Sequence, residues 1–229
     1  MKIYKLTVLL FALSVLVTSC RMVDVETTSN AGPMGRLSVT KEDISGTQTT
    51  SVFAYFFNSK DGHSIFPNEV SIDDQILPFK QLNDTSGFYS LDTINGLAET
   101  FRWKVTGSSE LDDFTYLDTR GFPALTQSFQ FPTNVFSKDE RIILNLPTVS
   151  NCTNFRIALP APINAKPYAV EIPVSQKTYI IEPEDIKYYS DGNKLFVYIF
   201  AINKKSVKEK SSTYMLYNET AFHAFLNVQ

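Results

Sequence analysis

The sequence of 229 residues is poor in the side chains that most often form cross-links or hold metals, with two cysteines and two histidines. Cys20 and Cys152 are too few for the disulfide framework of a small secreted domain. His63 and His223 lie far apart, and neither has a partner at the spacing of a metal-ligand set. We interpret them as a loop and a strand histidine, and we expect no metal and no cofactor.

A basic surface and known catalytic motifs are also lacking. The net charge of −3 argues against a nucleic-acid partner, which requires clustered Lys and Arg. No G-x-S-x-G, S-x-x-K, H-E-x-x-H or P-loop pattern occurs. Acidic pairs such as Asp73-Asp74 and Asp112-Asp113 are sequence neighbours, whereas a glycosidase places two carboxylates about 5–10 Å apart across a cleft. These acids are predicted to be solvated turn residues. We therefore expect that the protein is not an enzyme. A hydrolase site built from distant carboxylates is the remaining catalytic alternative.

The N-terminus has the architecture of an export signal. Lys2 and Lys5 precede an apolar run at residues 6–17, which only Thr7 and Ser14 interrupt. A helix of this length rises about 18 Å, well short of a hydrocarbon core about 30 Å thick. The run therefore predicts a signal peptide over residues 1–19.

The residues that follow resemble the lipobox of bacterial lipoproteins. Val17, Thr18, Ser19 and Cys20 supply a branched apolar residue, two small residues and a cysteine in register. The resemblance implies cleavage between Ser19 and Cys20 and attachment of a diacylglyceryl group to the Cys20 sulfur. The two chains of that group and an N-acyl chain exceed the two anchors that stable membrane attachment requires.

Three further expectations follow from the lipobox. Removal of residues 1–19 takes away Lys2 and Lys5 and changes the net charge from −3 to −5. Lipidation of Cys20 leaves Cys152 without an intramolecular partner, and we interpret Cys152 as a small buried hydrophobe. Arg21 differs from the aspartate that retains enteric lipoproteins in the inner membrane. We therefore expect an outer-membrane lipoprotein, on either its periplasmic or its cell-surface face.

Strand signals dominate the body of the chain. Residues 101–106 alternate strictly, with Phe101, Trp103 and Val105 on one face and polar residues on the other, which predicts a half-buried strand. Further strands are predicted at 51–57, 114–116, 141–146, 154–159, 195–202, 214–217 and 222–228. Residues 182–189 predict one helical turn, with Pro183 at its start. The basic cluster at 203–210 is interpreted as a solvated hairpin tip.

Turn residues separate these runs, most clearly at Asp61-Gly62, Ser86-Gly87, Asn95-Gly96 and Asp191-Gly192. Many short strands between turns predict an all-β protein of two Ig-like or transthyretin-like antiparallel β-sandwich domains. We expect a lipidated flexible tether at 20–36, an N-terminal sandwich at 37–136 and a C-terminal sandwich at 137–229. The Pro-rich and aromatic stretch 121–137 marks the predicted boundary.

The body resembles small β-sandwich lipoproteins of Bacteroidetes-type bacteria. The residues that carry this resemblance are Phe101-Arg102-Trp103-Lys104-Val105-Thr106-Gly107-Ser108, Gly121-Phe122-Pro123-Ala124 and Phe131-Pro132. It implies a fold and a compartment rather than an activity. A second resemblance is to fimbrillin-like pilus subunits, which are lipoprotein precursors with two β-sandwich domains.

The predicted function is a lipid-anchored binding or structural module of the cell envelope, with the membrane as one partner and a protein or glycan as another. The alternatives are a pilus or adhesion subunit and a glycan-binding lipoprotein. Aromatic residues near turns favour glycan binding, if they are exposed: Phe66, Phe88, Tyr89, Phe122, Tyr188 and Tyr189. Asp92-Thr93-Ile94 matches the O-glycosylation pattern of exported Bacteroidetes-type proteins, which makes Thr93 a candidate modification site.

Overall fold

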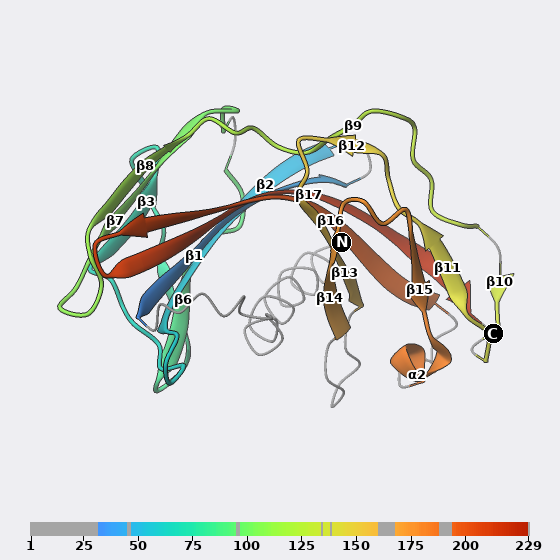
Figure 1. Cartoon of the computed structure of the whole chain (residues 1–229), viewed down its shortest axis with the longest axis horizontal. Coiled ribbons are helices and arrows are strands. Elements are labelled where there is room, and N and C mark those ends of the chain that lie inside the picture. Colours follow the sequence, from blue (N-terminus) through green and yellow to red (C-terminus); the bar gives the residue numbers. More distant parts are fainter. Residues whose placement is uncertain are drawn as a thin grey trace. The chain divides into compact units, whose positions relative to one another are not determined.

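The computed structural model describes residues 32–44, 47–94, 97–133, 135–137, 139–159, 168–187 and 194–228. Strands make up most of these residues, and they form largely antiparallel sheets (Figure 1). The predicted all-β sandwich class is confirmed. The predicted signal peptide, its cleavage site at Ser19 and the lipidation site Cys20 lie outside the described residues.

The strands are β1 (Pro33–Ile44), β2 (Thr47–Asn58), β3 (Glu69–Ile72), β4 (Gln75–Ile76), β5 (Phe79–Asn83), β6 (Ser86–Leu91), β7 (Phe101–Thr106), β8 (Phe114–Asp118), β9 (Ala124–Leu125), β10 (Val135–Phe136), β11 (Ile142–Asn145), β12 (Val149–Ser150), β13 (Asn154–Leu159), β14 (Tyr168–Pro173), β15 (Thr178–Ile181), β16 (Lys194–Glu209) and β17 (Ser212–Val228). One helix of a single turn, α2 (Pro183–Ile186), is present among the described residues. Pro183 occupies its first turn, and the Glu182 N–H donates to the Asp185 carboxylate at 3.1 Å. The predicted helical turn is therefore confirmed. No helix in the described ranges has the length and apolar character needed to cross a membrane.

The described chain divides into two compact units. The N-terminal unit consists of residues 32–123 and 202–220, and the C-terminal unit consists of residues 124–201 and 221–228. The long strands β16 and β17 contribute residues to both units. The predicted domains 37–136 and 137–229 are consecutive, whereas these units are interleaved along the chain. The chain first crosses from the N-terminal unit to the C-terminal unit after Pro123, which lies inside the Pro-rich stretch 121–137 that was predicted as the boundary.

The N-terminal unit is built from two sheets with a core between them. One sheet has the strand order β17-β1-β2-β6-β5, and the other has the order β4-β3-β7-β8. In β7 the predicted alternation is confirmed, since Phe101, Trp103 and Val105 are buried while Arg102 and Lys104 are exposed. Apolar residues of both sheets make up the core, including Leu37, Val39, Val52, Phe56, Val70, Ile72, Phe114 and Tyr214. Full burial of one such side chain contributes about 1.5–3 kcal/mol.

The C-terminal unit places a larger sheet against a two-stranded one. The larger sheet has the order β14-β13-β16-β17, with β10 pairing parallel to β17, and the smaller sheet pairs β11 with β15. The strands β9 and β12 form a further two-stranded pair. Mostly aliphatic residues fill the core: Ile142, Leu144, Phe155, Ile157, Leu159, Ile181, Leu195, Val197, Ile199 and Leu226.

The body of the protein begins earlier than predicted. β1 starts at Pro33, so the last four residues of the predicted tether at 20–36 belong to a strand. Gly35 in this strand is buried, and a Cβ atom there would lie 2.8 Å from the Tyr214 ring and 2.9 Å from the Phe56 ring. This glycine permits close packing and is not a sign of a flexible tether.

The predicted hairpin tip at residues 203–210 is wrong in its extent, because β16 continues to Glu209 and the turn itself is formed by Lys210 and Ser211. Asn203 is buried, and its carbonyl oxygen accepts a hydrogen bond from Arg120 Nη1 at 2.8 Å. Lys205 Nζ donates to the Tyr116 hydroxyl at 2.8 Å. Polar residues are stable in this strand because distant residues satisfy their hydrogen bonds.

The turn between β16 and β17 is formed by Lys210 and Ser211, and Lys210 has a φ of 49°. The carboxylate of Asp112 accepts hydrogen bonds from the backbone N–H and hydroxyl groups of Ser211 and Ser212, at 2.7–3.1 Å. These bonds to the ionised carboxylate lower the pKa of Asp112. The turn is thus fixed to the segment between β7 and β8.

Candidate functional site

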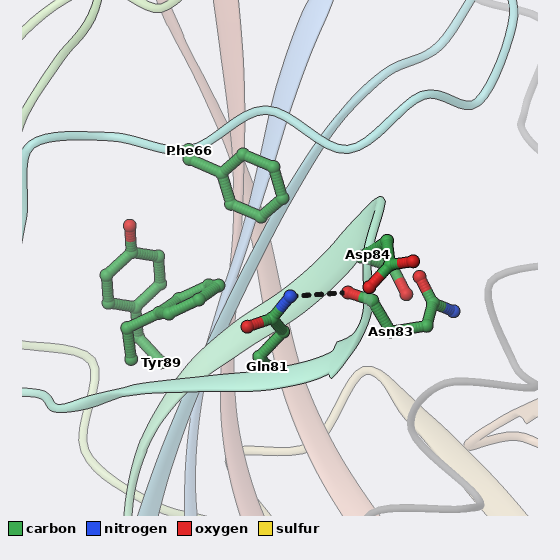
Figure 2. A pocket seen from close by; sticks show the side chains of 7 residues that line it. Phe66, Gln81, Asn83, Asp84 and Tyr89 are labelled. Atoms are coloured by element: carbon green, nitrogen blue, oxygen red, sulfur yellow. Dashed lines mark hydrogen bonds between the residues drawn. The ribbon is translucent and has the colours of Figure 1, made fainter.

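The candidate site is an open hollow beside the hairpin of β5 and β6, in the N-terminal unit (Figure 2). Its volume is about 240 Å³. It combines aromatic rings with amide, hydroxyl and carboxylate groups, and its lining residues are Phe66, Phe79, Gln81, Asn83, Asp84, Ser86 and Tyr89.

The register of the hairpin places the lining residues. β5 and β6 pair antiparallel, with Phe79 opposite Tyr89 and Gln81 opposite Gly87. The register shifts after Gln81, so the end of β5 departs from regular pairing. Such a bulge changes the direction of the side chains next to it.

The hairpin turn lies at Asp84 and Thr85. The Asn83 side-chain oxygen accepts hydrogen bonds from the Thr85 N–H at 2.9 Å and the Thr85 hydroxyl at 3.2 Å, which forms an Asx turn. The predicted turn at Ser86-Gly87 is therefore wrong by two residues, because both residues belong to β6.

Three aromatic side chains form the apolar wall of the hollow. Phe66 and Phe79 are 42% and 46% exposed, and their rings meet edge to face with centroids 5.4 Å apart. The Phe79 ring also contacts the buried Tyr89 ring at 5.3 Å. The Tyr89 hydroxyl donates to the Pro67 carbonyl at 2.7 Å, and burial raises the pKa of Tyr89. The Phe79 ring therefore packs on a buried side chain whose hydroxyl group is hydrogen-bonded, and Phe66 packs on Phe79.

Gly87 allows the Phe79 ring to lie directly on the backbone of β6. A Cβ atom at position 87 would be 2.4 Å from Phe79 Cζ and 2.9 Å from the Lys80 carbonyl oxygen. Both distances are shorter than van der Waals contact permits, so only glycine fits. The ring is consequently supported on one side and open to solvent on another.

The polar rim has unused hydrogen-bonding capacity. Gln81 Nε2 donates to the Asn83 carbonyl at 3.1 Å (Figure 2), and this contact leaves the Gln81 side-chain oxygen open. Within the described part of the chain, the Asp84 carboxylate, the Asn83 amide nitrogen and the Ser86 hydroxyl make no hydrogen bond. The hollow thus offers donors and acceptors beside apolar ring surface.

Two of the six aromatic residues singled out in the sequence, Phe66 and Tyr89, line the hollow. Phe88 is 2% exposed and stacks on Phe53 at 5.2 Å, and Phe122 is buried in the core. Tyr188 and Tyr189 lie outside the described residues.

Phe79 lines the hollow but was not predicted from the sequence. Residues 79–83 (FKQLN) do not alternate between apolar and polar side chains, so periodicity gave no signal for this strand.

The two histidines lie in a loop and in a strand, as predicted. His63 is exposed, with Nδ1 2.7 Å from Asp61 Oδ1 and Nε2 2.9 Å from Glu110 Oε2. The hydrogen bonds with Glu110 and Asp61 raise the pKa of His63. His223 lies in β17 with its ring centroid 5.6 Å from that of Tyr198. The described residues contain no group of three His, Cys, Asp or Glu side chains suited to a metal ion.

The acidic pairs lie in connections between strands and bind backbone N–H groups there. Asp73 and Asp74 both have positive φ, at 44° and 61°, and an Asp73 carboxylate oxygen accepts from the Arg102 N–H at 2.7 Å. The Asp113 carboxylate accepts from the Gly107 N–H at 2.8 Å. The interpretation as turn residues is confirmed for Asp73 and Asp74, whereas Asp112 and Asp113 lie in the connection between β7 and β8, with Asp112 partly buried.

Thr93, the candidate O-glycosylation site, is exposed, and its hydroxyl donates to the Asp92 carbonyl at 2.8 Å. Its modification stays a prediction. Cys152 is partly buried against the C-terminal core, with Sγ 3.1 Å from the Asn154 carbonyl oxygen. It is less buried than predicted, because it lies in the connection between β12 and β13 rather than inside a strand.

A comparison with models of known protein families finds no match, and a search of curated proteins finds no similar chain. The resemblance to β-sandwich lipoproteins of Bacteroidetes-type bacteria therefore stays a prediction.

Proposed function

We propose that this chain is a lipid-anchored, non-enzymatic binding module of the bacterial cell envelope, with the hollow at β5 and β6 as its contact site. The observation that carries the binding role is the pair of exposed rings, Phe66 and Phe79, beside open polar groups. Exposed rings held in one place provide apolar contact area at little cost in conformational entropy.

The anchor of this proposal rests on the sequence at Cys20. The apolar run at 6–17 and the small residues before Cys20 support export and acylation. The stretch from Cys20 to Gly32 spans at most about 40 Å when fully extended. The body would then work close to the outer membrane, on its periplasmic or cell-surface side.

Acylation is tested by expressing the precursor in a Gram-negative host that is fed alkyne-tagged palmitate. We expect label on the wild-type protein, fractionation with the outer membrane, and an N-terminal peptide that begins at an acylated Cys20. The Cys20→Ser variant should lose the label, because its hydroxyl does not replace the lipid-accepting sulfur.

The matched control is Cys152→Ser, which removes the other cysteine and should keep the label. An intact Met1 terminus, or an unmodified thiol at position 20 in the wild-type protein, would contradict the anchored module.

A further inference from the structure

We infer that the hollow binds one sugar ring of a glycan, an inference that rests on the proposed binding role of this site. The C–H groups of the ring would lie against Phe66 and Phe79. Its hydroxyl groups would bind the rim formed by Gln81, Asn83 and Asp84.

The aromatic wall suits the apolar face of a sugar. A pyranose ring presents C–H groups on its faces and hydroxyl groups around its edge. The faces of aromatic rings carry negative charge density, which attracts polarised C–H groups. Phe66 and Phe79 expose nearly half of their surface each, and their edge-to-face contact keeps the two rings from stacking on each other.

The rim suits hydroxyl groups because it contains both donors and acceptors. The Asp84 carboxylate and the Gln81 side-chain oxygen accept, whereas the Asn83 amide nitrogen donates. A hydroxyl group both donates and accepts hydrogen bonds. Adjacent hydroxyl groups of a sugar therefore satisfy all three of these rim groups. The side chain of lysine supplies donors alone and would leave the Asn83 amide unpaired. The negative charge of Asp84 opposes phosphorylated or carboxylated ligands.

The size of the hollow limits the ligand. Its volume of about 240 Å³ is below the range of about 300–1,000 Å³ that is usual for drug-sized ligands. One ring fits this space, and an open site of this size binds it with a dissociation constant on the order of 1 mM. Many anchored copies on one membrane would bind a multivalent glycan more strongly than this value indicates.

The test is saturation-transfer NMR on the mature lipoprotein in detergent micelles. The probes are the methyl glycosides of glucose, galactose, mannose and N-acetylglucosamine. We expect saturation transfer to the ring C–H groups of at least one glycoside. Phe79→Ala should reduce that transfer at least fivefold by removing half of the exposed wall.

Two further variants keep this test specific. Asp84→Asn preserves both rings and should weaken binding several-fold, because a charged acceptor becomes a neutral amide. Phe225→Ala is the matched control, since it removes another exposed phenylalanine, 61% exposed in β17 of the C-terminal unit, and should leave the transfer unchanged. Circular dichroism confirms that each variant is folded.

The inference is overturned if none of the four glycosides receives saturation, or if the Phe79→Ala and Phe225→Ala variants behave alike. It is also overturned if Nα-acetyl-lysine methylamide binds in place of the glycosides. Any of these three results would leave the acylation test unaffected. Conversely, glycoside binding by a protein without lipid on Cys20 would remove the anchor and retain the sugar site.

Discussion

The core of the N-terminal unit mixes aromatic with aliphatic side chains, whereas the buried core of the C-terminal unit is almost entirely aliphatic. Trp103, Phe114 and Tyr214 are buried in the first core, and the Phe114 and Tyr214 rings stack with centroids 3.9 Å apart. In the second core, Phe155 is the one aromatic residue among the described fully buried members. The two units therefore reach similar burial with different chemistry.

The difference matters because the hydroxyl group of a buried tyrosine can form a hydrogen bond with the backbone of a loop. In the N-terminal unit, the hydroxyls of Tyr89 and Tyr214 donate to the backbone carbonyls of Pro67 and Asp112, both in connecting segments. In the C-terminal unit, the hydroxyls of Tyr168 and Tyr179 instead bind each other. Aromatic packing thus fixes the loops of the N-terminal unit, which is where the hollow lies.

The ion pairs also differ between the units, and their removal should change stability the most. In the N-terminal unit Asp118 is fully buried, and Arg120 binds its carboxylate through Nε at 3.0 Å and through Nη2. Arg120→Met leaves a buried carboxylate without its cation, so we expect the free energy of unfolding to fall by about 3–5 kcal/mol. Urea titration followed by circular dichroism measures this change.

Arg141→Met in the C-terminal unit is the control. Arg141 pairs with Glu182 at 2.8 Å, and the two side chains are 68% and 40% exposed. Its removal should change the free energy of unfolding by about 0–1 kcal/mol. Equal effects of the two substitutions would contradict the expected difference between the buried ion pair and the exposed one.

Close packing at Gly87 should hold the hollow together. The methyl group of Gly87→Ala collides with the Phe79 ring and the Lys80 carbonyl. We expect a loss of about 1–3 kcal/mol in the free energy of unfolding, together with loss of glycoside saturation transfer.

Gly62→Ala is the matched control for this test. Gly62 has a φ of +76°, and no atom lies within 4 Å of the position that an alanine methyl group would take there. Its substitution costs about 1–2 kcal/mol through backbone conformation alone. Glycoside binding should survive in Gly62→Ala, and its loss there would show that the hollow responds to general destabilisation.

Local sequence patterns predicted the elements that depend on residues close together in the sequence. β7 was predicted because Phe101, Trp103 and Val105 alternate strictly with polar residues, and its burial follows that alternation. The helical turn at Pro183 was predicted for the same kind of local reason, since its capping residues are neighbours in sequence.

The remaining features depend on residues that are distant in sequence. Asn203 is buried in a strand, where its side-chain amide donates to the Arg120 carbonyl and its own carbonyl accepts from the Arg120 side chain, and these residues are 83 positions apart. Gly35 and Gly87 suggested turns or flexibility, but both permit contact with aromatic rings from other strands. The hollow could not be predicted for this reason, since the position of the Phe79 ring depends on Gly87.

The smallest expected effect concerns the exposed His63 cluster of the N-terminal unit. Its hydrogen bonds with Glu110 and Asp61 raise the pKa of His63 above the ordinary 6.5. The stabilisation is therefore fully present below pH 6.5 and is lost as the pH rises through the folded-state pKa. Relative to His63→Gln, the urea midpoint of the wild-type protein should be constant at pH values below 6.5 and should fall as the pH rises above 6.5.

Salt provides the control for this prediction, because ions screen exposed charges. The pH-dependent difference should shrink as ionic strength rises. A difference that stays constant across this pH range would show that the cluster contributes through packing and not through charge.

The most direct test of the sugar site is a titration of the isotopically labelled mature protein with a methyl glycoside, followed through its backbone amide signals. We predict shifts at residue 66 and at residues 79–89, around the hollow, and none at residues 139–159 of the C-terminal unit. Shifts centred on the C-terminal unit, or unchanged signals at glycoside concentrations well above about 1 mM, would contradict the sugar site.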